Sequence, residues 1–194
     1  MIRPVLVLFG LLALGCGDVK QLARSAKEAA VEAKKAANTP PMPCDAVVKE
    51  PMPDRCITGS LHCGEVIEGT TAGGDSRFND EFYSDKFCFP AGGNHSGPER
   101  AYLLDAPPYT SITVTLQSDC VDLDLAAIAF NYDGACPTID HPVPECEGRD
   151  RRGGDKITLQ TFNNPRRYVV AVDGKDGATG TFRMAVECQE ITRR

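Results

Sequence analysis

The segment SITVTLQS, residues 111–118, alternates polar and apolar side chains without interruption. Successive side chains of a β-strand point to opposite faces of a sheet, so this pattern predicts a strand with one wet and one dry face. Other short apolar segments stand between turn-forming residues, at 63–71, 99–106, 123–131, 155–162, 166–174 and 180–188. Seven or eight short strands without a helical period predict an all-β fold, an antiparallel, jelly-roll-like β-sandwich.

The composition changes ahead of this predicted sandwich. Five prolines lie between residues 39 and 56 and disfavour regular structure, so residues 39–62 are predicted to be a linker. The sandwich is then expected over residues 63–194, about 130 residues, which is a usual size for one domain. From residue 39 onward the chain carries 24 acidic and 15 basic residues. An acidic domain of this kind is not expected to bind nucleic acid.

The chain begins with Arg3 and a short apolar run, residues 4–15, well below the roughly 20 residues that cross a bilayer as a helix. Such a start is typical of a secretory signal peptide, here residues 1–15. The end of the run, Ala13-Leu14-Gly15-Cys16, resembles the bacterial lipobox. The resemblance implies cleavage before Cys16 and a lipid on its sulfur. The alternative is an ordinary cleaved signal that leaves Cys16 as a free thiol or a disulfide partner.

The number of cysteines favours lipid attachment. The chain has nine, and setting Cys16 aside leaves eight, an even number suited to disulfides in an oxidising compartment. Acyl chains such as palmitate on a lipoprotein would hold its start in the membrane. Gly17 follows the cysteine, and aspartate comes only at Asp18. By resemblance to enteric lipoproteins this favours the outer membrane, on its periplasmic or cell-surface face.

Residues 19–38 favour a helix, because alanine, lysine and glutamate dominate and neither glycine nor proline occurs. Apolar side chains recur at spacings of three and four, which would also suit a coiled coil. Alanine buries little surface and fewer than three heptads are present, so a solvated tether helix is the favoured interpretation. The lipidated cysteine and the tether together make up the predicted segment 16–38.

Several features between residues 63 and 188 resemble the bacterial pre-peptidase C-terminal (PPC) domain in its cysteine-rich, myxobacterial form. They are Gly97-Pro98-Glu99 with Tyr102, the Asp-Leu-Asp-Leu of residues 122–125, the Cys136 and Cys146 pair, and the entry to a hairpin at residues 168–174. The resemblance implies a non-catalytic module of the cell envelope that binds a protein or a glycan. The alternative that it implies is an accessory domain or subunit of a secreted or envelope hydrolase, either a peptidase or a glycan-active enzyme.

The eight later cysteines allow 105 sets of disulfide pairs. The predicted positions of the strands favour one of these sets as a hypothesis. Cys136 and Cys146 bracket a proline-rich loop, and Cys63 and Cys188 stand at the first and last predicted strands. Cys88 and Cys120 flank strands that are plausible neighbours, and Cys44 then pairs with Cys56 by exclusion in the linker. Zinc is disfavoured because no Cys-x-x-Cys occurs.

A search for catalytic residues finds no established pattern. His62, His95 and His141 each lie in a turn-like stretch. The sequence GNHSG, residues 93–97, differs from the Gly-x-Ser-x-Gly of serine hydrolases and lacks the strand-then-helix context. The chain is therefore predicted not to be an enzyme and to need no cofactor. Calcium at Asp119, Asp122 and Asp124 is a less favoured alternative, because these oxygen ligands do not match the EF-hand spacing.

Aromatic residues gather in the acidic stretch SRFNDEFYSDKFCF, residues 76–89. One interpretation is that they cover an open end of the sandwich. The other is that part of the group is exposed and docks a protein partner, because aromatic side chains are enriched in interface hot spots. The candidate contact residues are Phe78, Phe82, Tyr83 and Phe87.

Overall fold

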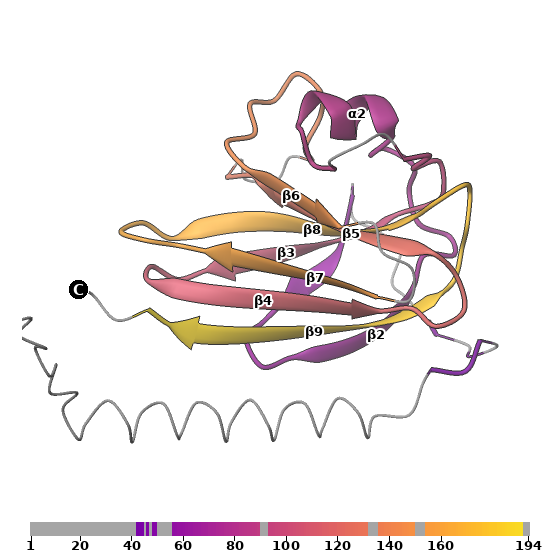
Figure 1. Cartoon of the computed structure of the whole chain (residues 1–194), viewed down its shortest axis with the longest axis horizontal. Helices are drawn as coiled ribbons and strands as arrows, with labels where there is room; N and C mark the ends of the chain where they lie inside the picture. The colour runs from indigo at the N-terminus through magenta and orange to yellow at the C-terminus, as the bar shows by residue number, and fades with distance from the viewer. Residues whose placement is uncertain are drawn as a thin grey trace, which may run out of the picture. The chain divides into compact units, whose positions relative to one another are not determined.

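The computed structural model of the chain describes residues 42–44, 46, 48–49, 56–89, 93–131, 136–149 and 154–191. The expected signal peptide, lipidated Cys16 and tether helix lie outside these residues. No helix in the described part is long and apolar enough to cross a membrane. The described residues from Met42 onward form one compact unit, and they confirm the predicted all-β sandwich (Figure 1).

Two sheets make up the sandwich. The five-stranded sheet has the order β1 (Ile57–Leu61), β3 (Arg100–Ala106), β8 (Arg166–Gly174), β5 (Leu123–Ala129) and β6 (Cys146–Arg149). The four-stranded sheet has the order β2 (Val66–Thr70), β9 (Thr181–Glu190), β4 (Thr110–Gln117) and β7 (Asp155–Gln160). Neighbouring strands are antiparallel except β1 and β3, which are parallel.

Each of the seven predicted strand segments forms a strand, and three elements were not predicted. Strand β1 lies inside the predicted linker 39–62, so the sandwich begins before residue 63. Its sequence, ITGSL, has little apolar character and is ordered by its pairing with β3. Strand β6 has only four residues, one of them glycine, and the six-residue helix α2 (Asp80–Asp85) is too short to show a helical period.

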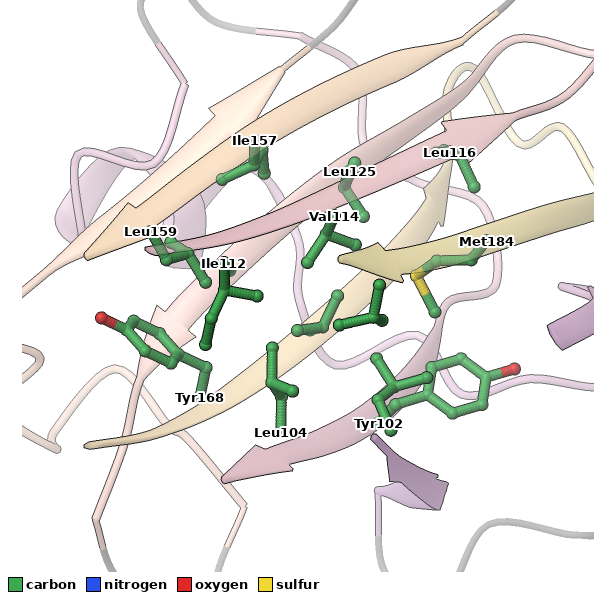
Figure 2. Packing of buried hydrophobic residues seen from close by; sticks show 14 of the residues in the cluster. Tyr102, Leu104, Ile112, Val114, Leu116, Leu125, Ile157, Leu159, Tyr168 and Met184 are labelled. Carbon is green, nitrogen blue, oxygen red and sulfur yellow. The ribbon is translucent and has the colours of Figure 1, made fainter. Parts of the chain in front are cut away.

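The main hydrophobic core fills the space between the two sheets. In β4 the alternation holds as predicted, with Ile112, Val114 and Leu116 buried. Figure 2 shows these side chains, with those of β7 and β9, pointing toward side chains of β3, β5 and β8. Burial of this apolar surface is the main driving force for packing the sheets.

The five-stranded sheet is also covered on its outer face. Every described residue of β5 is buried, including those that point away from the main core. A second apolar cluster lies there, which includes Ala126 and Ile128 of β5, Val169 and Ala171 of β8, and Phe78, Phe82 and Tyr83. The last three belong to residues 75–89, the segment that holds α2 and that we call the cover. Figure 1 shows α2 over this face of the sheet.

Four disulfides stabilise the domain, and the expected Cys63–Cys188 is one of them. The other three differ from the expected pairing: Cys44–Cys120, Cys56–Cys136 and Cys88–Cys146. The pairing of Cys136 with Cys146 is corrected because Cys146 begins β6, beside the cluster that contains Cys88. Cys120 lies close enough to Met42 to contact its carbonyl oxygen, which brings it to Cys44.

Peptide mapping without reduction should recover all four of these links. The structure brings each pair of Cα atoms to within 5.9 Å, inside the range that a disulfide needs. Recovery of Cys136 linked to Cys146, or of Cys44 linked to Cys56, would contradict the structure.

Candidate functional site

The cover begins a short helix and then turns sharply. Asn79 caps α2, because its side-chain oxygen accepts a hydrogen bond from the Phe82 backbone amide at 3.0 Å. Phe82 and Tyr83 point to the sheet, whereas Glu81 and Asp85 face solvent. The helix ends at Asp85 with Lys86 as its C-cap, and the next residue, Phe87, has a φ of 54°. A bulky side chain rarely adopts this left-handed conformation.

Three of the four predicted contact residues are buried. Phe78, Phe82 and Tyr83 are each at most 3% exposed and pack together, with the two phenylalanine rings 4.9 Å apart. They cannot meet a partner in this conformation, which corrects that part of the docking expectation. The physical reason is that the outer face of β5 and β8 is apolar and needs covering. Phe87 differs: its exposed fraction is 87%.

Phe87 has a second apolar residue near it. The Lys86 amine donates a hydrogen bond to the Ile139 carbonyl oxygen at 2.6 Å, which joins the end of the cover to the loop before β6. Ile139 is itself 41% exposed. Exposed acidic side chains stand on both segments, at Glu81, Asp85 and Asp140. We call Phe87 and Ile139 with these acidic residues the tip.

Three buried carboxylates lie side by side beneath the cover. Asp124 of β5 is the cross-strand partner of Asp173 of β8. Glu99 comes directly before Arg100, which pairs with Val172, so continuing the register sets Glu99 on the other side of Asp173. All three side chains are almost fully buried. In each carboxylate one oxygen is hydrogen-bonded, while the other is buried and accepts no hydrogen bond.

His95 lies between this row of carboxylates and α2. Its Nε2 is 3.0 Å from an Asp124 oxygen, and its Nδ1 is 2.9 Å from an Asp80 oxygen. The Phe89 ring stacks on the imidazole with centroids 4.3 Å apart. Phe89 lies close to β6 because residue 148 is glycine: a Cβ there would stand 2.6 Å from its ring. The Tyr83 hydroxyl donates to Asp173 at 2.7 Å.

Burial and neighbouring charges shift the pKa values of these carboxylates and of His95. Burial, helped by the charge of Glu99, raises the pKa of Asp173 to about 7, against the opposing effects of Tyr83 and His95. Burial also raises the pKa of Glu99. Burial acts to lower the pKa of His95, but its hydrogen bonds to Asp124 and Asp80 and the charge of Asp173 raise it above the ordinary value. The backbone amide of His95 lowers the pKa of Asp80.

The predicted calcium ligands do not come together. Asp124 points to His95, whereas Asp119 accepts a hydrogen bond from the Gln117 side chain at 3.3 Å. Among the described residues no group of three His, Cys, Asp or Glu side chains is arranged to hold a metal ion. The residues around His95 predict a turn, and no sequence pattern indicates the role of its side chain. Only the pairing of β5 with β8 and the fold of the cover reveal that role.

The arrangement around His95 does not resemble a catalytic centre. Both ring nitrogens contact carboxylates, and the side chain is 2% exposed, so neither nitrogen is placed to activate a hydroxyl or thiol. Two open depressions in the described surface lie elsewhere. The larger, of about 440 Å³, is lined by Asp105, Ala106, Pro107, Asn131 and residues 165–167. The other is lined by Ala129, Asn131 and residues 142–144.

Comparison with solved structures finds similar chains, among them the following two. One is the pre-peptidase C-terminal domain of collagenase from Bacillus anthracis, 11% identical over 70% of this chain and 100% of that chain, with a TM-score of 0.38. The other is PliG, a periplasmic inhibitor of g-type lysozyme from Aeromonas hydrophila, 14% identical over 68% and 94%, with a TM-score of 0.38. No family profile and no curated protein match the sequence. These values do not show family membership or a shared activity.

Removal of the Tyr83 hydroxyl should weaken the domain. In Tyr83→Phe the buried Asp173 carboxylate loses its donor, so we expect the free energy of unfolding at neutral pH to fall by about 1–3 kcal/mol. Urea denaturation followed by circular dichroism measures the change. The matched control is Tyr109→Phe, whose hydroxyl bonds Asn163 at an exposed position and whose loss should cost under about 0.5 kcal/mol. Equal losses in the two variants would contradict the assignment.

Proposed function

We propose that this chain is a lipid-anchored, non-catalytic module of the bacterial cell envelope that binds a protein partner through the tip. The observation that carries the proposal is the state of Phe87. A large aromatic ring is left 87% exposed at the end of a well-packed cover, while its three aromatic neighbours are buried. Exposed aromatic side chains of this kind are typical anchors of protein interfaces.

The backbone at Phe87 supports the same proposal. A non-glycine residue with a φ of 54° carries local strain of about 1–3 kcal/mol, and such residues cluster at binding and switch sites. The strain is tolerated because the neighbours on both sides are held: Lys86 donates to Ile139, and Cys88 is linked to Cys146. Phe87 therefore projects from a fixed base.

The charges of the tip favour a particular partner. Glu81, Asp85 and Asp140 are exposed, and the Lys86 amine, which pairs with Asp85 at 2.7 Å, is largely buried, so the exposed charge of the tip is acidic. A protein with an apolar pocket for the Phe87 ring and a basic rim around it is the complement of this surface. A single aromatic ring among carboxylates is less suited to a neutral glycan.

The non-catalytic part of the proposal rests on His95. Its two ring nitrogens contact the carboxylates of Asp80 and Asp124, one on each side. The lipid part rests on the resemblance of residues 13–16 to a lipobox. A module anchored in this way would face its partner within the envelope, and eight disulfide-bonded cysteines suit that oxidising compartment.

Photo-crosslinking in cells tests the contact. A photoreactive phenylalanine analogue at position 87 should yield a discrete crosslinked species, because the ring would sit in the partner's pocket. The matched control is position 162, where Phe162 is also exposed, at 63%, but lies beyond β7. Crosslinking at 162 and not at 87, or at neither position, would contradict the proposal. The crosslinked species identifies the partner by mass spectrometry.

A pair of substitutions then distinguishes the contribution of the Phe87 ring to binding from that of its backbone conformation. Phe87→Asn keeps a residue that tolerates positive φ but removes the ring, and recovery of the partner should fall about tenfold or more. Phe162→Asn should leave recovery unchanged. Equal recovery with Phe87→Asn and the unmodified chain would exclude Phe87 as the anchor.

Cys16→Ser tests the anchor. Without a sulfur to accept lipid, the protein should move from the membrane fraction to the soluble fraction, because the domain's own surface would not hold it there. Metabolic labelling with an alkyne fatty acid should mark the unmodified chain and not the variant. A variant that stays in the membrane fraction, or labelling that persists in it, would contradict lipid attachment at Cys16.

A further inference from the structure

The cover is held on the five-stranded sheet by ionisable groups as well as by apolar ones. Asp80 and Tyr83 come from α2, and His95 comes from the segment that follows the cover. The sheet supplies Asp124 from β5, Asp173 from β8 and Glu99 from the residue before β3. Asp75, at the start of the cover, forms a β-bridge with Glu99 and adds its charge there.

The carboxylates of the sheet cannot all be ionised at low cost. Adjacent strands lie about 4.8 Å apart, and like charges at that spacing in a buried site disfavour each other's ionisation. One oxygen of each of Glu99, Asp124 and Asp173 is buried without a hydrogen bond. A proton bound there turns a costly buried charge into a neutral acid.

The contacts of His95 also indicate that a proton is bound beneath the cover. A neutral imidazole has one donor nitrogen, but both nitrogens of His95 lie within 3.0 Å of carboxylate oxygens. Both contacts are hydrogen bonds only if the ring carries two protons or one of the aspartates is itself protonated. In either case a proton is bound between His95 and its two aspartates when the cover is closed. The same side chains would bind that proton less tightly when the cover is open.

We propose that the cover is a proton-controlled element: protons bound by His95 and the row of buried carboxylates close it on the sheet, and their loss at higher pH loosens it. The proposal concerns the cover alone and does not depend on the tip having a partner.

The direction of the pH effect follows from linkage. His95, Glu99 and Asp173 have pKa values raised in the closed state, so their stabilising contribution is complete at low pH and is lost as pH rises through those values. Asp80 has a lowered pKa, so its contribution is lost only in acid. The cover should therefore be most firmly closed in mildly acidic solution and should loosen as pH rises through about 7, the pKa of Asp173.

The loosening should stay local. The main core between the sheets contains none of these groups. The Cys88–Cys146 disulfide keeps the far end of the cover next to β6 whatever the pH. Only the start of the cover and α2 depend on Asp80, Tyr83 and His95.

Hydrogen exchange of the full chain tests the proposal. Protection factors of α2, corrected for intrinsic exchange, should be on the order of tenfold lower at about pH 8.5 than at about pH 5.5, while those of β4 change little. In Asp173→Asn, which keeps the acceptor for Tyr83 but cannot ionise, most of this difference should disappear. The matched control is Asp105→Asn, an exposed carboxylate paired with Arg167, which should retain it.

A second measurement needs no variant. The ring proton of His95, followed by NMR, should titrate with a midpoint above 6.5, because its carboxylate partners favour the protonated form. The proposal is overturned by protection of α2 that is constant or rises with pH, by an equal loss in β4, by full pH dependence in Asp173→Asn, or by a His95 midpoint below 6.5.

Discussion

The rest of the structure depends on the burial of β5 and β8 on both faces. These central strands of the five-stranded sheet face the other sheet on one side, and their second face is also apolar. An apolar face of this size does not stay in water, so a segment of the chain has to cover it. Residues 75–89 cover this face with Phe78, Phe82 and Tyr83. The last two of these side chains are carried by the short helix α2.

The same burial explains the polar group at one end of the face. Asp124 and Asp173 stand where the alternation of β5 and β8 turns side chains toward the cover, so the fold takes them out of water. Buried carboxylates are costly unless they are paired or neutral. His95 and Tyr83 provide hydrogen bonds to Asp124 and Asp173, and bound protons neutralise the charge that remains. The segment that completes the hydrophobic face is therefore also the segment whose hold on the sheet responds to pH.

Sequence patterns predicted the features that depend on local periodicity. The alternation in SITVTLQS identified β4 and its buried face, and the other six segments likewise became strands. Features set by contacts between distant segments were not predicted. Strand β1 needs β3 beside it, and Cys88 meets Cys146 only because the cover lies next to β6. His95 looked like a turn residue, since nothing in GNHSG shows that Asp80 and Asp124 will meet its ring.

The aromatic stretch shows how one pattern can contain two physical roles. In residues 76–89, Phe78, Phe82 and Tyr83 are buried, but they cover the outer face of β5 and β8 rather than an open end of the sandwich, and Phe87 is left in solvent. Only Lys86 separates α2 from Phe87. A shift of α2 on the sheet would therefore also move the backbone next to the exposed ring. If the tip binds a partner as proposed, proton release beneath α2 would loosen the helix that precedes Phe87, while the Cys88–Cys146 disulfide still holds the residue that follows it. Binding at the tip would in turn favour the closed, protonated cover, because linkage between two sites is reciprocal.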